Sequence, residues 1–106
     1  MAGASCAGSI RPAAPRLTAS GVRFVVLDRE ARSVALAGSF NDWSPSSLRL
    51  AREGSGGYWA IVVPLPPGEH AFMYVVNGTQ WISPPLAEDY VDDGFGAKNG
   101  VVVVRP

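Results

Sequence analysis

The stretch GSFNDW at residues 38–43 follows a run of small apolar residues and places a tryptophan at the end of a polar loop. Residues 34–37, VALA, are typical of a buried strand, and Gly38 permits a turn with unusual backbone dihedrals. The asparagine and aspartate of the loop can hydrogen-bond to their own backbone, and the Ser-Pro pair that follows restricts the chain directly after the indole. The sequence therefore predicts a rigid loop that displays Trp43.

Short apolar segments separated by turn signals lie on both sides of this loop. Residues 21–27 have one fully apolar face, and the charged segment 28–32 predicts a hairpin that joins them to a strand over residues 33–37. A short strand is expected over residues 47–50, and the glycine-rich segment 53–57 predicts a turn. Helical periodicity is absent, and the turn signals recur roughly every 8 to 12 residues. This spacing predicts an all-β, antiparallel immunoglobulin-like β-sandwich of about seven strands.

Composition limits the chain to one domain and a narrow set of partners. With 106 residues, of which 47% are apolar, one core can form, and Cys6 has no cysteine to pair with. Nine basic and nine acidic side chains cancel, and the arginines are scattered, so neither nucleic acid nor a membrane is expected as a partner. We expect a flexible Ala/Pro/Ser-rich tail over residues 1–20 and the folded domain over residues 21–106. The tail lacks a continuous apolar segment, which favours a cytoplasmic protein without a secretion signal or an anchor.

The hairpin around Asn77-Gly78 decides which face of its strand Trp81 joins. A two-residue loop would place Trp81 opposite Tyr74, whereas a three-residue loop through Thr79 would pair Trp81 with Val75. Phe72, Tyr74 and Val76 make the better core set, which favours the three-residue loop. Trp81 is then expected to point outward beside Met73.

Three motifs resemble the glycogen-binding early-set family, which includes N-terminal modules of branching and debranching enzymes and the carbohydrate-binding module of the AMP-activated kinase β subunit. The motifs are GSFNDW at 38–43, LPPGEH at 65–70 and YVVNGTQW at 74–81. The resemblance covers nearly the whole folding unit. It implies a non-catalytic module for α-1,4-glucan, with glycogen, starch, maltooligosaccharide or cyclodextrin as ligands and a glucan-active enzyme or kinase-type complex as a further partner. It implies no cofactor.

The resemblance also implies the residues of a shallow carbohydrate-binding site. Trp43 and Trp81 match the two sugar platforms, Phe95 matches an apolar residue that inserts near the glucan, and Asn99 matches an asparagine that bonds a glucose hydroxyl. Two positions depart from the family: Met73 stands where the family has a sugar-bonding lysine, and Ala97 stands where it has a threonine. Fewer polar contacts are therefore expected.

Other interpretations of these residues stay open. The main alternative is an early-set protein-interaction or regulatory module with a degenerate sugar site, and a structural spacer with a vestigial site is a third. Trp43 on its own is also compatible with a lid on the sandwich edge, whereas Trp59 lies in a dense apolar strand and is expected in the core. The acidic residues of segment 88–93 do not have the spacing of a calcium loop, so no metal site is predicted. No catalytic set of residues occurs, and no enzyme activity is expected.

Overall fold

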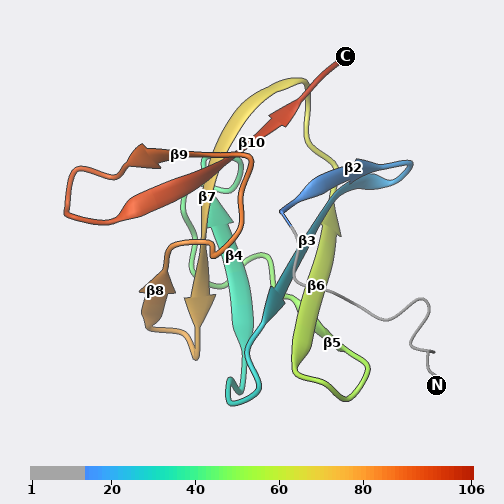
Figure 1. The fold of residues 1–106 in the computed structure, drawn as a ribbon, viewed down its shortest axis with the longest axis vertical. Helices are drawn as coiled ribbons and strands as arrows, with labels where there is room; N and C mark the ends of the chain where they lie inside the picture. The colour runs from blue at the N-terminus through green and yellow to red at the C-terminus, as the bar shows by residue number, and fades with distance from the viewer. Residues whose placement is uncertain (1–13) are drawn as a thin grey trace.

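The computed structural model describes residues 14–106, which form two antiparallel sheets packed as a sandwich (Figure 1). The four-stranded sheet has the order β2 (Arg16–Thr18), β3 (Gly21–Leu27), β6 (Tyr58–Val63), β5 (Ala51–Glu53). The five-stranded sheet has the order β4 (Val34–Gly38), β7 (Gly68–Val76), β10 (Lys98–Val104), β9 (Asp89–Asp92), and β8 (Gln80–Ile82) pairs with the end of β7 beyond β10. The predicted all-β antiparallel sandwich is confirmed, with nine strands in the described residues rather than about seven. These residues include no helix long and apolar enough to cross a bilayer.

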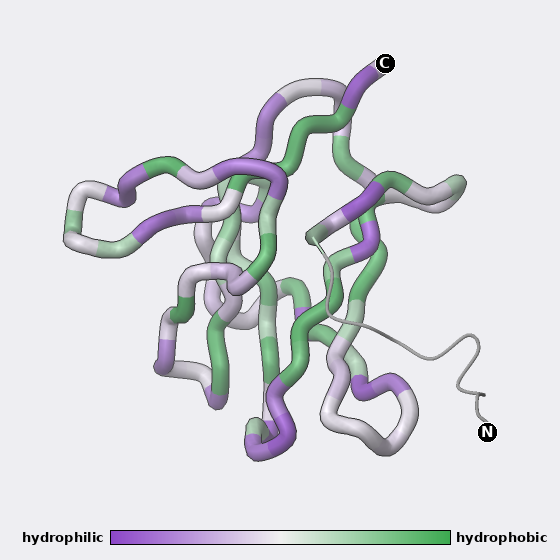
Figure 2. The backbone as a smooth tube through the Cα atoms, in the orientation of Figure 1, coloured by the Kyte–Doolittle hydropathy of each residue, from purple (hydrophilic) through white to green (hydrophobic). Residues whose placement is uncertain are grey.

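Large apolar side chains from both sheets fill the space between them. β3 contributes Val22, Phe24 and Val26, and β7 contributes Phe72, Tyr74 and Val76. The rings of Phe24 and Phe72 meet edge to face with centroids 5.1 Å apart, a favoured aromatic geometry. The predicted inner face of β7 and the predicted core position of Trp59, which is 4% exposed, are both confirmed. In Figure 2 the hydrophobic residues concentrate in the strands, and the connection at the bottom, between β3 and β4, is hydrophilic.

The predicted hairpin between residues 21–27 and 33–37 is wrong, because β3 and β4 belong to different sheets. The segment between them crosses from one sheet to the other. The Asp28 carboxylate accepts hydrogen bonds from the backbone N–H groups of Glu30 and Ala31, each 3.0 Å long, and Ala31 is buried in the core. The aspartate turn and the buried alanine carry the chain from one sheet to the other as an arch. The charged residues of this segment are equally compatible with a hairpin turn, so the sequence pattern does not separate the two.

Two other boundaries differ from the sequence prediction. Arg16–Thr18 form β2 and pair with β3, so ordered structure begins inside the stretch expected to be a tail; residues 1–13 lie outside the described residues. In segment 47–50 the only pairing is an isolated bridge between Arg49 and Ala35, and the strand begins at Ala51 instead. This segment covers the outer edge of β4, since Leu36 N–H donates to Leu48 O and Leu50 N–H donates to Val34 O.

The side chain of Asn41 holds the loop that follows β4. Its Oδ1 accepts a hydrogen bond from Gly38 N–H (2.9 Å), and its Nδ2 donates to Leu36 O and to Ser47 Oγ (3.0 Å each). The Trp43 N–H closes the turn by donating to Gly38 O at 2.9 Å. One amide thus ties the strand, the loop and the segment after the loop together, which confirms the predicted role of the loop asparagine.

Gly38 has a different role from the one expected. Its φ is not positive; instead, a Cβ there would lie 2.6 Å from Ala71 O and 2.5 Å from the Phe40 ring, so glycine is required for close packing. The left-handed backbone occurs at Asp42 (φ 56°) and Trp43 (φ 58°). Each costs a non-glycine residue roughly 1–2 kcal/mol, which the surrounding hydrogen bonds must offset.

On the four-stranded sheet, Arg23 and Glu53 form a bidentate ion pair, in which Arg23 Nη2 lies 2.6 Å from Glu53 Oε1 and Arg23 Nη1 lies 3.0 Å from Glu53 Oε2. The hydrogen bonds from Arg23 hold the pKa of the Glu53 carboxyl below its ordinary value of 4.5. A lowered carboxyl pKa stabilises the fold above the ordinary pKa, and this contribution is lost as the pH falls through the lowered value.

We therefore expect Glu53→Gln to lower the free energy of unfolding by about 0.5–1 kcal/mol at pH 7, a value typical of a partly exposed pair. The difference from wild type should shrink below about pH 4. Urea unfolding at pH 7 and at pH 3 measures this difference in the free energy of unfolding, with Glu69→Gln, a change at an exposed side chain, as control. An equal difference at pH 7 and pH 3 would contradict the ion-pair account.

Asn41→Ala removes four side-chain hydrogen bonds, including a long one to Ser44 O (3.5 Å), and leaves backbone groups of the strained loop without partners. The free energy of unfolding should fall by about 1–3 kcal/mol. Asp42→Asn is the matched control, because this exposed side chain can be exchanged for another that tolerates positive φ, and it should change stability by less than about 0.5 kcal/mol. Similar urea midpoints for the two variants would show that Asn41 does not hold the loop.

Candidate functional site

The outer face of the five-stranded sheet, which points away from the core, carries small residues under Trp43. Pairing of β4 with β7 places Ala35 opposite Val75 and Ala37 opposite Met73 on this face. Trp43 is partly buried and packs against Ala35, Ala37 and Val75. Small side chains leave room for an indole to lie close to the sheet. The loop tryptophan therefore folds onto the sheet face and keeps part of its surface in solvent.

Trp81 reaches the same outer face from β8. The register pairs Val76 with Gln80 and Val75 with Trp81, so the connecting loop has three residues. This confirms the predicted loop and the predicted outward direction of Trp81. Asn77 (φ 55°) and Gly78 (φ 80°) supply the positive backbone angles, and the Asn77 carboxamide oxygen accepts a 2.7 Å hydrogen bond from Arg32 N–H. The indole is 42% exposed. Val75 therefore lies between the Trp43 contact on one side and Trp81 on the other.

Met73 and Asn99 also belong to this outer face. Met73 pairs with Ala37 and is 6% exposed, so it forms part of the floor of the site rather than a projecting group. On β10, Gly100 pairs with the inward-facing Phe72. Successive strand residues point to opposite faces, so the neighbouring Asn99 points to the outer face. Asn99 is partly buried, and the strand beside it approaches the end of β8, where Lys98 N–H donates to Ser83 Oγ at 3.3 Å.

Phe95 lies apart from the strand positions, in the turn between β9 and β10. This hairpin extends sideways from the sandwich at the left of Figure 1. The ring is 93% exposed, the most exposed large hydrophobic side chain among the described residues. Asp93 holds the turn, because its Oδ1 accepts hydrogen bonds from the N–H groups of Phe95 (2.7 Å) and Ala97 (3.1 Å). The structure thus places four of the five predicted site residues on one face and the fifth at the tip of a hairpin.

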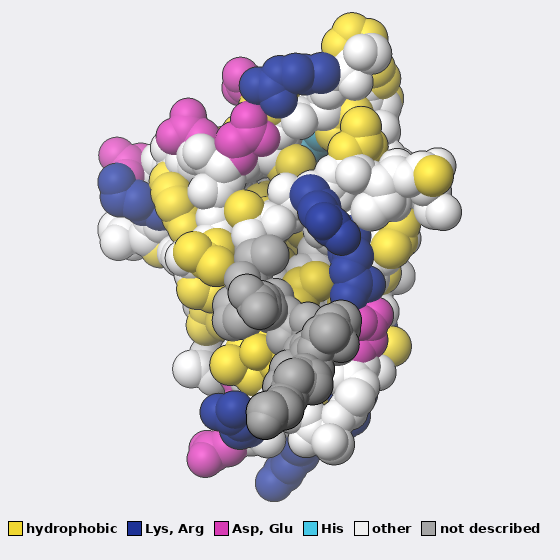
Figure 3. Space-filling view, turned by 45° about the vertical axis from the view of Figure 1, so that its right-hand side comes forward, with side chains coloured by type: hydrophobic (Ala, Val, Ile, Leu, Met, Phe, Trp, Pro, Cys, Tyr) yellow, Lys and Arg dark blue, Asp and Glu magenta, His cyan; other side chains and the backbone are white. Residues whose placement is uncertain are grey.

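The acidic residues of segment 88–93 have structural partners. Besides Asp93, Glu88 pairs with Arg105 (3.2 Å) and Asp92 pairs with Lys98 (3.6 Å). In the part of the chain from residue 14 onward, no group of three His, Cys, Asp or Glu side chains is arranged to hold a metal ion. Charges of both signs are scattered over the face in Figure 3, with hydrophobic side chains between them.

Two features of the site have no counterpart in the sequence prediction. Phe40 packs against the core while Trp43, three residues later, packs on the outer face, so the loop is fixed on both sides of the sheet. The outer face carries only small residues at Ala35 and Ala37. Their alternation with core residues in the sequence could have predicted this. Nothing in the sequence pattern indicated that Phe40 turns inward.

Comparison with known proteins identifies one family and several relatives. The model of a family described as "Glycogen recognition site of AMP-activated protein kinase" matches residues 23–106. Over 74 residues, 70% of this chain, the sequence is 36% identical to 5'-AMP-activated protein kinase subunit beta-1 of Sus scrofa, and the match covers 56% of that protein. The beta-1 subunit of Homo sapiens is also 36% identical over 74 residues, which are 25% of its length.

A bacterial relative matches a shorter segment. The 1,4-alpha-glucan branching enzyme of Bacillus caldolyticus is 41% identical over 58 residues, which are 55% of this chain and 9% of that enzyme. The chain thus matches only part of the length of each of these relatives. Because the family model spans most of the chain and both sheets of the sandwich, the chain belongs to the family of the glycogen recognition site of AMP-activated protein kinase.

Proposed function

We propose that this chain is a non-catalytic module that binds α-1,4-glucan of the glycogen or starch type on the outer face of the five-stranded sheet. The observation that carries the proposal is the position of Trp43 and Trp81 on one face, on either side of Val75. Family membership supports the ligand class. Maltooligosaccharides and cyclodextrins share the α-1,4-linked glucose units and are suitable soluble ligands.

The chemistry of the two indoles fits a glucose chain. One side of a pyranose ring presents C–H groups that lie flat on an indole, and its hydroxyls point to the rim, where Asn99 offers an amide. Covering about 100 Å² of one indole is worth about 2.5 kcal/mol before ordering costs. Met73 and Ala97 supply no polar side-chain contact, so single-site affinity is expected in the micromolar to millimolar range, roughly −8 to −4 kcal/mol. Several sites on one branched polymer would raise the effective affinity.

Binding to glucan gives the module a targeting role rather than a chemical one. Relatives named as a kinase subunit and a branching enzyme support an association with a glucan-active enzyme or a kinase-type complex. Glycoside hydrolysis requires two carboxyl groups about 5–10 Å apart across a cleft. On the proposed surface the floor consists of alanine, valine and methionine instead, which suits adsorption.

A protein-interaction module is the second candidate. Met73 in place of a polar sugar contact favours it, and so do the exposed hydrophobic side chains Leu86, Tyr90, Val91 and Phe95 around β9. A module of this kind needs no sugar ligand and no pair of tryptophans on one face. Direct titration with glucan therefore separates the two candidates.

Isothermal titration calorimetry with maltoheptaose should give saturable binding to the wild type and none with cellohexaose. Trp43→Ala and Trp81→Ala should each weaken it at least about tenfold, since each removes about 1.4 kcal/mol or more of contact. Leu17→Ala is the matched control, because it removes a 58% exposed side chain from the other sheet. Circular dichroism establishes that each variant is folded.

Absence of binding at about 10 mM maltoheptaose, beyond the weak end of the expected range, would contradict the proposal and favour the protein-interaction candidate. Binding that survives both tryptophan substitutions would place the glucan on another surface.

A further inference from the structure

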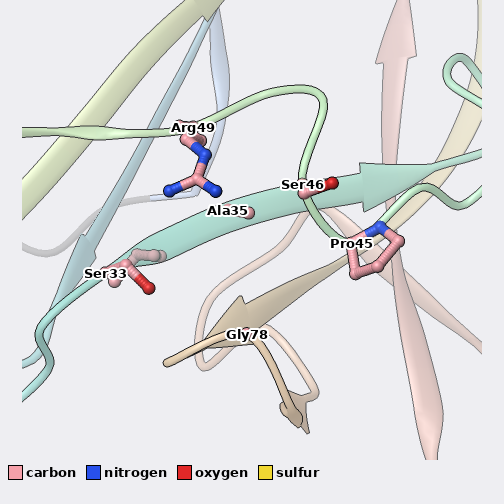
Figure 4. A pocket seen from close by; sticks show the side chains of 7 residues that line it. Ser33, Ala35, Pro45, Ser46, Arg49 and Gly78 are labelled. Atoms are coloured by element: carbon pink, nitrogen blue, oxygen red, sulfur yellow. The ribbon is translucent and has the colours of Figure 1, made fainter.

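A small cavity lies on the outer face beside Trp43. Its volume is about 70 Å³, and it opens between the segment after the indole and the turn after β7 (Figure 4). Its lining includes Ser33, Ala35, Pro45, Ser46, Arg49 and Gly78. Ala35 belongs to both features, because it lies under the Trp43 indole and also lines the cavity. A group in the cavity would therefore be next to a ligand on Trp43.

Arg49 gives the cavity its chemical character. The isolated bridge between Arg49 and Ala35 brings the arginine to the edge of β4, and in Figure 4 its guanidinium extends toward Ala35. Among the described residues, Arg23 and Arg105 pair with glutamates, and Arg52 lies over Trp59 and donates to Ala31 O. The Arg49 side chain is exposed and has no ion pair or hydrogen bond there, as is also true of Arg16, Arg29 and Arg32, but only Arg49 of these four lines the cavity. None of the residues lining the cavity is acidic. The guanidinium therefore faces a space with no opposite charge.

Two serines also line the cavity, and in Figure 4 the Ser46 hydroxyl points away from the Arg49 guanidinium. Ser33 and Ser46 use their backbone N–H groups in turns, and within the described residues neither hydroxyl has a hydrogen-bond partner. A hydroxyl can donate to an anionic oxygen, as a guanidinium does. Measured in the same way, one water molecule needs about 10–15 Å³, so a cavity of about 70 Å³ has room for a compact group of several heavy atoms.

We propose that this cavity binds a phosphate monoester, and that the phosphate is carried by a glucose unit of a glucan lying on Trp43. A guanidinium presents paired N–H donors that match phosphate oxygens, which makes arginine the usual partner of this group. The glucan part rests on the proposed function, but the phosphate part stands on the cavity alone. The module would then prefer a phosphorylated α-glucan to a neutral one.

The test compares maltoheptaose with maltoheptaose that carries one 6-phosphate, by calorimetry at low salt and pH 7.5. The wild type should bind the phosphorylated ligand about five to ten times more tightly, as expected for a charge-assisted contact that is partly screened by water. Arg49→Gln should abolish this preference and leave the affinity for neutral maltoheptaose unchanged. Arg16→Gln, an exposed arginine of β2, should keep it. The preference should decrease at pH 5, because the second phosphate pKa is about 6.

Two results overturn the inference while leaving glucan binding intact: equal affinity of the wild type for both ligands, and an unchanged preference in Arg49→Gln. If neither oligosaccharide binds, the proposed function fails separately, and inorganic phosphate then tests the cavity by NMR titration. Arg49-dependent shifts of residues 33, 46 and 78 would support a phosphate site with a free phosphate as its source. No shifts at about 20 mM phosphate, a millimolar-range limit, would overturn the site as well.

Discussion

The structure depends on the way residues 38–43 pass around the end of the five-stranded sheet. Phe40 packs into the core on one side, and Trp43 packs on small residues on the other side. Gly38 makes this passage possible because any side chain there would collide with Ala71 O and with Phe40 itself. Asn41 then satisfies the backbone groups that the passage exposes. A strained left-handed backbone at the tryptophan is maintained by this surrounding network.

The strand β7 contributes both to the core and to the floor of the proposed binding surface. Its inward residues include the aromatic Phe72 and Tyr74, which pack in the core with residues of β3, whereas its outward residues include Met73 and Val75, which form a low floor with the alanines of β4. A low floor lets Trp43 from a loop and Trp81 from strand β8 lie on the same face of the sheet. The same floor provides little hydrogen-bonding capacity, so polar contacts to a neutral glucan must come from the rim, where Asn99 lies.

Sequence patterns predicted the features that depend on local periodicity. Alternation in residues 72–76 identified the core face of β7, and that choice fixed the three-residue hairpin loop and the direction of Trp81. Patterns failed where tertiary contacts decide: the charged segment 28–32 looks like a hairpin turn but forms an arch anchored by buried Ala31. Packing space at Gly38 and the cavity at Arg49 arise from segments distant in sequence, and no local pattern encodes them. The binding roles of Trp43, Trp81, Met73, Phe95 and Asn99 stay predictions.

We expect a glucan to bind across Trp43 and Trp81 on the outer face of the five-stranded sheet. NMR spectroscopy of the three indole N–H groups tests it most directly, because Trp59 is a built-in control: it is buried on the opposite sheet and donates to Asp28 O at 3.0 Å. On titration with maltoheptaose, the Trp43 and Trp81 signals should shift together along one saturation curve while Trp59 stays fixed. Shifts confined to Trp59, or unchanged signals for Trp43 and Trp81 at saturating ligand, would contradict the account.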